Sequence, residues 1–291
     1  MKKEVEIVNK RTGGVRIAFG IASVILALYC VTLIYPFVWM FQTSLKTSLE
    51  YFTLGPLDFS SEPQWKNYIE VFDKLKVKES NFFIMMWNTL WHTFGSSTIG
   101  IFASSVVAYC LSKYKFGARN FMYAVIIFIM VYPSMGTSGA SYKQAHDLGI
   151  FDTPFMLIKS AGGYSGKAFF VIYSFFVTLP WDYGDAALID GANDYQVFFK
   201  IMLPMAMGPI MAMYTVDVIG GWNDYMNILL YLPSYPTLMA GLYLYESDMT
   251  RAVNYPLYYT GVIVSIIPVL IAFACCQDLI MKNVTMGGLK G

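Results

Sequence analysis

A few polar and ionisable side chains interrupt stretches of sequence that are otherwise apolar. Lys159 and Lys167 flank a glycine-rich stretch, and Asp217 lies in a long apolar run that also holds Trp222 and Asn223. An ionisable side chain inside a membrane span is costly, so it marks a functional site or a water-filled path by default. The lysines either meet an acidic group of a solute or snorkel to the outer membrane surface. Asp217 either bonds a solute hydroxyl or pairs with a lysine. We predict that these five residues line a path for a polar solute.

Residues that would support catalysis or metal binding are not grouped along the chain. The two histidines, His92 and His146, are isolated, and the four cysteines lie in apolar runs. Gly166-Lys167 resembles the end of a phosphate-binding loop, but Ala168 follows where that loop has Ser or Thr. We therefore predict no catalytic residue, no metal site and no cofactor bound by this chain, which is not expected to be an enzyme.

The composition indicates a membrane protein. Of 291 residues, 56% are hydrophobic and only 13% are charged, with a mean hydropathy of +0.50. A soluble domain carries about 25% charged residues, which it needs to cover a surface that faces water. The net charge of +1 provides no basic surface for nucleic acid. We therefore expect membrane lipid, and not nucleic acid, among the partners.

Six apolar segments approach or exceed the length of about 20 mostly apolar residues that a transmembrane helix needs. They are residues 17–41, 82–111, 121–142, 153–179, 203–232 and 257–276. Glycines and two lysines interrupt the fourth segment, so we expect its middle to be irregular. The pattern predicts an all-α integral membrane fold with six transmembrane helices.

The distribution of Lys and Arg sets the orientation, because basic loops are retained on the cytoplasmic side. Such residues cluster in residues 1–16 and in the turn after the second segment. We therefore expect a cytoplasmic N-terminal segment (1–16), a first transmembrane helix (17–41) and an extracytoplasmic loop (42–81). A core of five transmembrane helices (82–280) then contains a cytoplasmic loop (180–204), and a cytoplasmic tail (281–291) follows.

The loop at 180–204 has a pattern of apolar residues that indicates local structure. Apolar residues around Ala186 and Ala187, and again around Ile201, predict two short helices. Gly191 permits the turn between them, and Pro204 suits the first turn of the next helix. Two short helices with apolar faces either dock a soluble partner or rest on lipid headgroups.

The spacing within this loop resembles a motif of ABC importer permeases, E-A-A-x-x-x-G followed by nine residues and I-x-L-P. The matching residues here are Asp185, Ala186, Ala187, Gly191, Ile201, Leu203 and Pro204. The first position holds Asp in place of Glu, which keeps the charge and shortens its reach. Other segments resemble the carbohydrate branch of these permeases, which includes the six-span maltose permease subunit. These segments are residues 108–113, 148–150, 189–192, 222–223 and 290–291.

The resemblance implies a type I importer permease of the bacterial cytoplasmic membrane, with both termini in the cytoplasm. Loop 180–204 would act as a coupling loop that docks on an ATPase subunit, and ATP-driven alternating access would carry a sugar or oligosaccharide into the cell. The implied partners are a second related permease, two ATPase subunits and an extracellular sugar-binding protein. ATP and Mg would be hydrolysed by the ATPase subunits and not by this chain.

Two other functions remain open from the residues alone. One is an importer of the same architecture for an amino acid, a peptide or an anion. The other is an ion-coupled carrier in which Asp217 works with Lys159 or Lys167 as a relay. A membrane-embedded enzyme has no supporting constellation of His, Cys or paired carboxylates.

Overall fold

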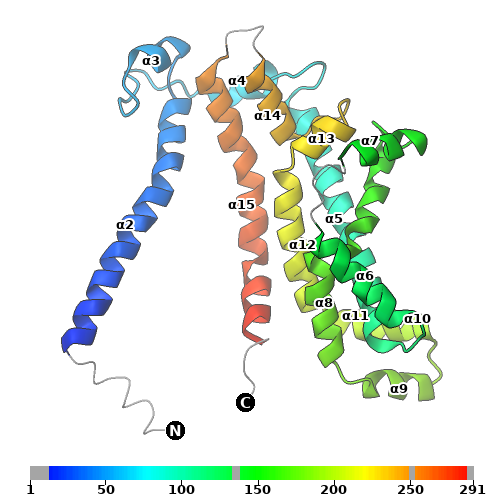
Figure 1. Cartoon of the computed structure of the whole chain (residues 1–291). Coiled ribbons are helices and arrows are strands. Elements are labelled where there is room, and N and C mark those ends of the chain that lie inside the picture. Colours follow the sequence, from blue (N-terminus) through cyan, green and yellow to red (C-terminus); the bar gives the residue numbers. More distant parts are fainter. Residues whose placement is uncertain (1–12, 133–137, 249–252, 287–291) are drawn as a thin grey trace. The chain divides into compact units, whose positions relative to one another are not determined.

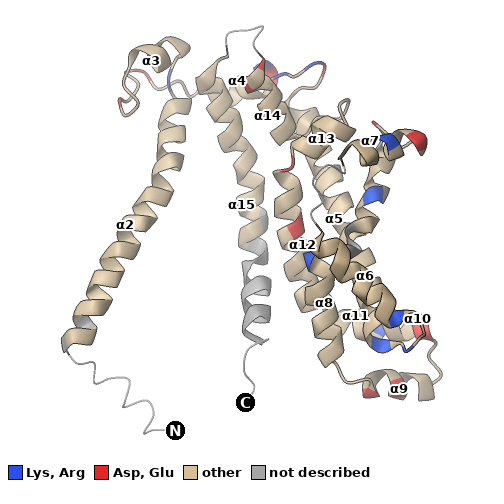
Figure 2. Cartoon of the chain, viewed as in Figure 1, with Lys and Arg blue, Asp and Glu red and all other residues tan. Residues whose placement is uncertain are grey.

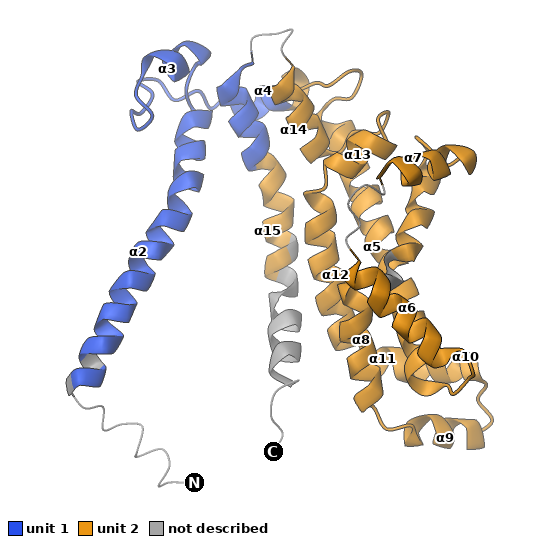
Figure 3. Ribbon diagram, in the orientation of Figure 1, with its two compact units in different colours: residues 1–71, 252–263 blue, residues 72–251, 264–291 orange. Residues whose placement is uncertain are grey.

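The computed structural model describes residues 13–132, 138–248 and 253–286 (Figure 1). Within these ranges the regular structure is helical, apart from one isolated β-bridge between Val77 and Ser80. The chain divides into two compact units, residues 1–71 with 252–263 and residues 72–251 with 264–291 (Figure 3). Most of the predicted N-terminal segment (1–12) and the end of the predicted tail (287–291) lie outside the described residues.

The first unit is built on one long apolar helix. α2 (Gly13–Ser44) extends the predicted first span at both ends, and it leads to α3 (Ser48–Thr53) and α4 (Asn67–Lys74). The amide of Asn67 donates to the backbone oxygens of Ser44 and Lys46, at 2.8 and 3.2 Å. These bonds satisfy carbonyl groups at the end of α2, where no further helical turn follows.

Glu50 organises the loop after α2. Thr47 caps α3, and the Glu50 carboxylate accepts from the Thr47 backbone N–H at 2.9 Å and from Ser60 Oγ at 2.9 Å. The backbone N–H of Thr47 is the main cause that lowers the pKa of the Glu50 carboxyl below its ordinary value, and desolvation opposes it. The loop thus depends on an ionised carboxylate.

The second unit surrounds α5 (Phe82–Lys113), which packs against η1, α8 and α12. The remaining helices of this unit are α6 (Arg119–Val131), α7 (Ser138–Asp147), the 3₁₀ helix η1 (Pro154–Ser165), α8 (Lys167–Thr178), α9 (Asp182–Ile189), α10 (Asp194–Val197), the π-helix η2 (Phe198–Met202), α11 (Leu203–Met205), α12 (Met207–Trp222), α13 (Met226–Tyr231) and α14 (Leu238–Ser247). The last helix, α15 (Tyr255–Met286), contributes to both units.

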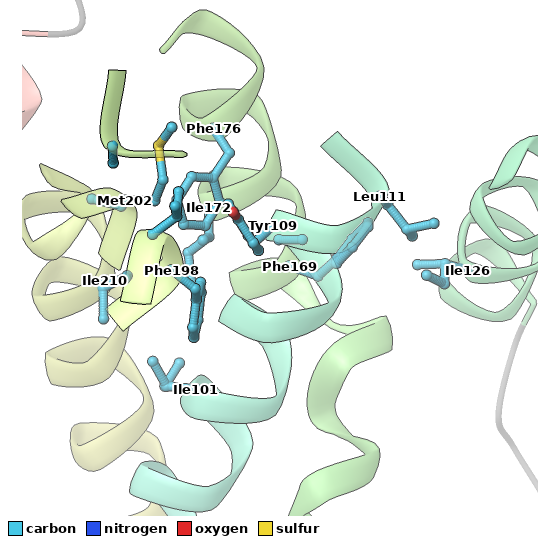
Figure 4. Close-up of a cluster of buried hydrophobic side chains, with 14 residues drawn as sticks. Ile101, Tyr109, Leu111, Ile126, Phe169, Ile172, Phe176, Phe198, Met202 and Ile210 are labelled. Atoms are coloured by element: carbon cyan, nitrogen blue, oxygen red, sulfur yellow. The ribbon is translucent and has the colours of Figure 1, made fainter. Parts of the chain in front are cut away.

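A cluster of buried apolar side chains joins α5, α6, α8 and the helices that follow α8 in the second unit (Figure 4). Phe169, Ile172 and Phe176 on α8 are fully buried. The ring of Tyr109 on α5 lies 5.6 Å from that of Phe176 and 4.8 Å from that of Phe198, between ring centroids. Such contacts join α5, α8 and η2 through van der Waals packing, the main source of helix association in a membrane.

Among the described residues, two helices are long and apolar enough to cross a membrane, residues 17–44 and 82–113. The predicted third span (121–142) is wrong in length, because α6 ends at Val131 after 13 residues. Tyr132, which follows, precedes a proline and has the extended conformation (φ −67°, ψ 125°) that a following proline favours. The polar helix α7 covers the rest of the predicted range from Ser138.

The predicted fifth span (203–232) is also not one helix. Residues 194–205 and 207–222 form a pair bent by 73°, with the π-helix η2 and Pro204 on one side of the bend. π-helical turns and proline both disturb the regular backbone ladder, so a bend here is expected. α12 ends at Trp222, and Asp224 then accepts from the backbone N–H of Asn227 at 3.1 Å.

The predicted irregular fourth span has the expected break. The 3₁₀ helix η1 precedes α8, and Gly166 in an extended conformation separates the two. Gly100 of α5 lets η1 approach closely, since a Cβ there would lie 3.1 Å from the Ser160 backbone oxygen.

Candidate transport cavity and docking loop

The loop at 180–204 forms the two predicted short helices. Asp182 and Asp185 lie in the first turn of α9, where negative charge is favourable. Gly191 has φ +85°, the left-handed conformation that glycine adopts at least cost, so the predicted turn at this residue is confirmed. α10 begins with a capping box, in which Asn193 and Gln196 each bond the other's backbone N–H at 2.9 Å.

Side chains near the end of α5 hold this loop in place. The Tyr114 hydroxyl donates to Asp194 Oδ1 at 2.8 Å, and the Tyr114 ring packs edge-on against Trp181 with centroids 6.0 Å apart. Lys113 Nζ donates to the backbone oxygen of Leu179 at 2.5 Å. Burial, followed by the hydrogen bonds with Tyr109 and Asp194, raises the pKa of Tyr114, which therefore stays a donor at physiological pH.

Residues 180–204, the candidate docking loop, expose some of their apolar side chains and bury others. Ile189 is 86% exposed and Tyr195 is 78% exposed, whereas Ala187 is only 8% exposed and belongs to the buried cluster. Ala186 is exposed. The two alanines of the motif therefore lie on different faces of α9, because neighbouring residues of a helix are about 100° apart.

The other motif residues have distinct positions. Asp185 is exposed, and Pro204 is exposed in the first turn of α11. Ile201 and Leu203 are half-buried and pack against the same buried cluster that holds Ala187. The second half of the motif thus fixes the loop to the helical core.

A cavity of about 640 Å³ lies within the second unit. Its walls come from α5, η1, the start of α8, α12 and α13, with the loop before α13. The lining residues are His92, Ser96, Gly100, Ile101, Ser104, Met156, Lys159, Ser160, Gly166, Lys167, Ala168, Met213, Val216, Asp217, Gly220, Gly221, Asp224, Asn227, Tyr231 and Leu232. This volume is in the range of small-molecule sites.

Three of the five residues predicted for the solute path line this cavity. Lys159, Lys167 and Asp217 come together although they belong to three different helices. Lys159 Nζ lies 3.7 Å from the centre of the Tyr231 ring. The other two residues are absent from the lining. Trp222 is 3% exposed, and Asn223 turns back to bond the Ile219 backbone oxygen at 2.8 Å.

The cavity also contains residues that we did not predict. His92, Ser96, Gly100 and Ser104 form a row along α5, one residue in every four. That spacing places small and polar groups on one face of the helix, so the signal is present in the sequence. Asp224, which accepts from the backbone N–H of Asn227 in the first turn of α13, lines the cavity as well.

Charge is sparse along the long helices and is concentrated in loops and at helix ends (Figure 2). The described residues hold no group of three or more His, Cys, Asp or Glu side chains with metal-binding proximity.

Residues 96–285 match the family described as the binding-protein-dependent transport system inner membrane component. The chain belongs to this family. It is therefore a transport permease of the cytoplasmic membrane and not an enzyme. The matched range includes the docking loop and nearly all of the cavity lining, so both lie in the part that defines the family.

Individual related proteins agree with this family membership, and their similarity extends over most of the chain. The inner membrane ABC transporter permease protein YcjP of Escherichia coli K12 is 28% identical over 97% of this chain and 99% of its own length. The arabinooligosaccharides transport system permease protein AraQ of Bacillus subtilis 168 is 27% identical over 94% of this chain and 98% of its own. One chain of a bacterial ABC transporter involved in the import of the acidic polysaccharide alginate has the same fold. Its TM-score is 0.75 at 23% identity, over 92% of this chain and 98% of that one.

Proposed function

We propose that this chain is the permease subunit of a carbohydrate importer that works by ATP-driven alternating access. The observation that carries the proposal is the docking loop. It exposes apolar side chains at Ile189 and Tyr195, yet it is held to α5 through Tyr114 and Asp194. A rigid loop with exposed apolar residues suits a protein partner, because a preformed surface loses little entropy on binding.

The assignment of a carbohydrate rests on relatives and on the chemistry of the cavity. The relative AraQ is a permease for arabinooligosaccharides. The cavity offers hydroxyl, amide, ammonium and carboxylate groups, which together donate to and accept from sugar hydroxyls. An amino acid, peptide or inorganic anion is the alternative cargo.

The proposed assembly contains a second related permease, two ATPase subunits and an extracellular sugar-binding protein. ATP and Mg bind the ATPase subunits, and Asp185, Ala186, Ile189 and Tyr195 contact one of them. Because one chain supplies only one docking loop, two ATPases require two permeases. The substrate path in this subunit includes Lys159, Lys167 and Asp217.

We also propose six spans with both termini in the cytoplasm. α2, α5 and α15 each form one span, and α6 forms a short one. The other two spans are composite, with η1 and α8 in one and α10 to α12 in the other. In this arrangement residues 1–16 and 281–291 are cytoplasmic, residues 42–81 are extracytoplasmic, and loop 180–204 faces the ATPase.

The test is capture of the ATPase by the tagged permease, purified in mild detergent with mass spectrometry of what accompanies it. Ile189→Asp is expected to reduce ATPase capture at least tenfold, because docking would bury an unpaired charge. Because the Ile189 side chain is highly exposed, we expect the substitution to change the fold little. Leu148→Asp is the matched control, since Leu148 is 64% exposed outside the docking loop, and it is expected to leave capture unchanged.

Two results would contradict the proposal. One is purification of the native chain with neither an ATPase nor a second permease. The other is solute uptake in vesicles that an uncoupler abolishes and that ignores Ile189→Asp. Together they would point to the ion-coupled carrier.

A further inference from the structure

The charged groups of the cavity are separated onto two walls. Lys159 and Lys167 stand on the wall formed by η1 and the start of α8, while Asp217 and Asp224 stand on the wall formed by α12 and the turn after it. No lysine–carboxylate ion pair joins these four residues in the structure. Because these charges are not paired with one another, the cavity offers both ammonium and carboxylate groups to a solute with different chemistry at its two ends.

The four charged groups differ in how many contacts they already make within the protein. Both carboxylate oxygens of Asp224 accept from Asn227, at 3.1 Å from its backbone N–H and 2.7 Å from its amide. Lys159 lies over the Tyr231 ring and retains N–H groups for a ligand. Lys167 and Asp217 are both exposed to the cavity and have no partner among the described residues.

The backbone strengthens this separation. Lys167 is the first residue of α8, a helix of 12 residues whose N-cap, Gly166, has no side chain to cap it. Gly166, Lys167 and Ala168 all line the cavity, so the positive end of this helix is on the lysine wall. Gly220 and Gly221 near the end of α12 line the opposite wall, where their backbone oxygens accept from the N–H groups of Asn223 and Asp224.

A lysine in the first turn of a helix is electrostatically unfavourable, because its charge and the helix end are both positive. An anionic group bound between them removes this repulsion and accepts charge-assisted hydrogen bonds from both. On the opposite wall, the free carboxylate of Asp217 accepts hydrogen bonds from hydroxyl groups.

We propose that the cavity takes a saccharide that carries an anionic group, a carboxylate or a sulfonate, with that group on the Lys159 and Lys167 wall. The hydroxyls of the same saccharide face Asp217. This substrate class rests on the proposed carbohydrate import and deepens it, since import of neutral saccharides alone satisfies the proposed function and not this inference.

The experiment follows uptake by cells that carry the complete importer, compared with cells that lack this permease. The medium contains neutral oligosaccharides from arabinan, xylan and starch, anionic oligosaccharides from pectin and alginate, and a sulfonated sugar glycoside. Mass spectrometry measures the loss of each from the medium. We expect permease-dependent uptake of a uronate oligosaccharide or of the sulfonated glycoside, and which one is taken distinguishes carboxylate from sulfonate.

Three variants test whether the anionic group of the saccharide binds at the lysine wall. Lys167→Met is expected to reduce uptake of the anionic saccharide about tenfold or more, the typical effect of losing a hydrogen bond to a charged group. Lys167→Arg keeps the charge and is expected to restore most of the uptake. Lys143→Met removes an exposed lysine of α7 that does not line the cavity and is expected to change nothing.

The outcomes separate the two proposals. Permease-dependent uptake of neutral saccharides only, or anionic uptake that Lys167→Met leaves unchanged, overturns the anionic substrate class and leaves the carbohydrate importer standing. Absence of permease-dependent uptake of every saccharide overturns the proposed function itself.

Discussion

A substitution at Gly191 measures how much the left-handed backbone conformation of this one residue contributes to ATPase binding. Its φ of +85° is in the left-handed region, and a Cβ built on it meets no atom within 4 Å. Gly191→Ala therefore introduces no clash, and its cost is that of the backbone alone, about 1–2 kcal/mol. A penalty of this size lowers the equilibrium constant between the native turn and its alternative conformations by a factor of about 5–30. If the ATPase binds only the native turn, its Kd rises by at most the same factor.

The assay is titration of the ATPase onto the purified permease pair in lipid nanodiscs. Gly191→Asn is expected to raise the Kd less than Gly191→Ala, because Asn tolerates the left-handed conformation better than Ala does. Gly139→Ala serves as the control, since Gly139 lies in helix α7 with open space around its Cα, and its Kd is expected to match the wild type. A Kd that rises more than about 30-fold for Gly191→Ala, or that rises more for Gly191→Asn than for Gly191→Ala, would refute the argument.

Three further predictions concern the supports of the fold. Tyr114→Phe removes the hydrogen bond to Asp194 and is expected to cost about 1 kcal/mol of unfolding free energy in thermal melts at neutral pH. Because the pKa of Tyr114 is raised, its contribution is fully present below about pH 10 and is lost only as the pH rises through the raised value. A melt of Tyr114→Phe with the pH profile of wild type above pH 10 would contradict this. Gly241→Ala places a Cβ onto Met85 Sδ and is expected to cost about 1–3 kcal/mol. The double variant with Met85→Ala should cost less than the sum of the two single changes, and strict additivity would show that the two do not meet. For Glu50, the lowered pKa means that its stabilising effect is present above the ordinary value of 4.5 and is lost as the pH falls through the lowered one. Proteolysis of the loop after α2 should therefore accelerate in acid for wild type, and Glu50→Gln should show no such acid dependence.

Several features followed from the sequence because they depend on local rules. A charge-free apolar run longer than the membrane thickness predicts a helix, and α2 and α5 match such runs. The turn at Gly191 and the break at Gly166 follow from the conformational freedom of glycine. The spacing of the docking loop carried the family resemblance, and the family match includes that loop.

Other features were decided by tertiary structure. Asp217 and the two lysines are far apart in the sequence, and only the packing of α5 between η1, α8 and α12 brings them to one cavity. Trp222 was expected in the same path, yet it faces the protein interior. A helix that is apolar all round has no periodicity to show which face meets a cavity and which meets a neighbouring helix.

The lengths of the third and fifth predicted spans were wrong for a related reason. Hydropathy is averaged over a window of many residues. It therefore does not detect the extended conformation of Tyr132 before a proline or the π-helical turn before Pro204. The chain's apolar content therefore determined that it is a membrane protein of helices. Where those helices end and bend, and which of their few charges share a cavity, depended on backbone geometry and packing between distant segments.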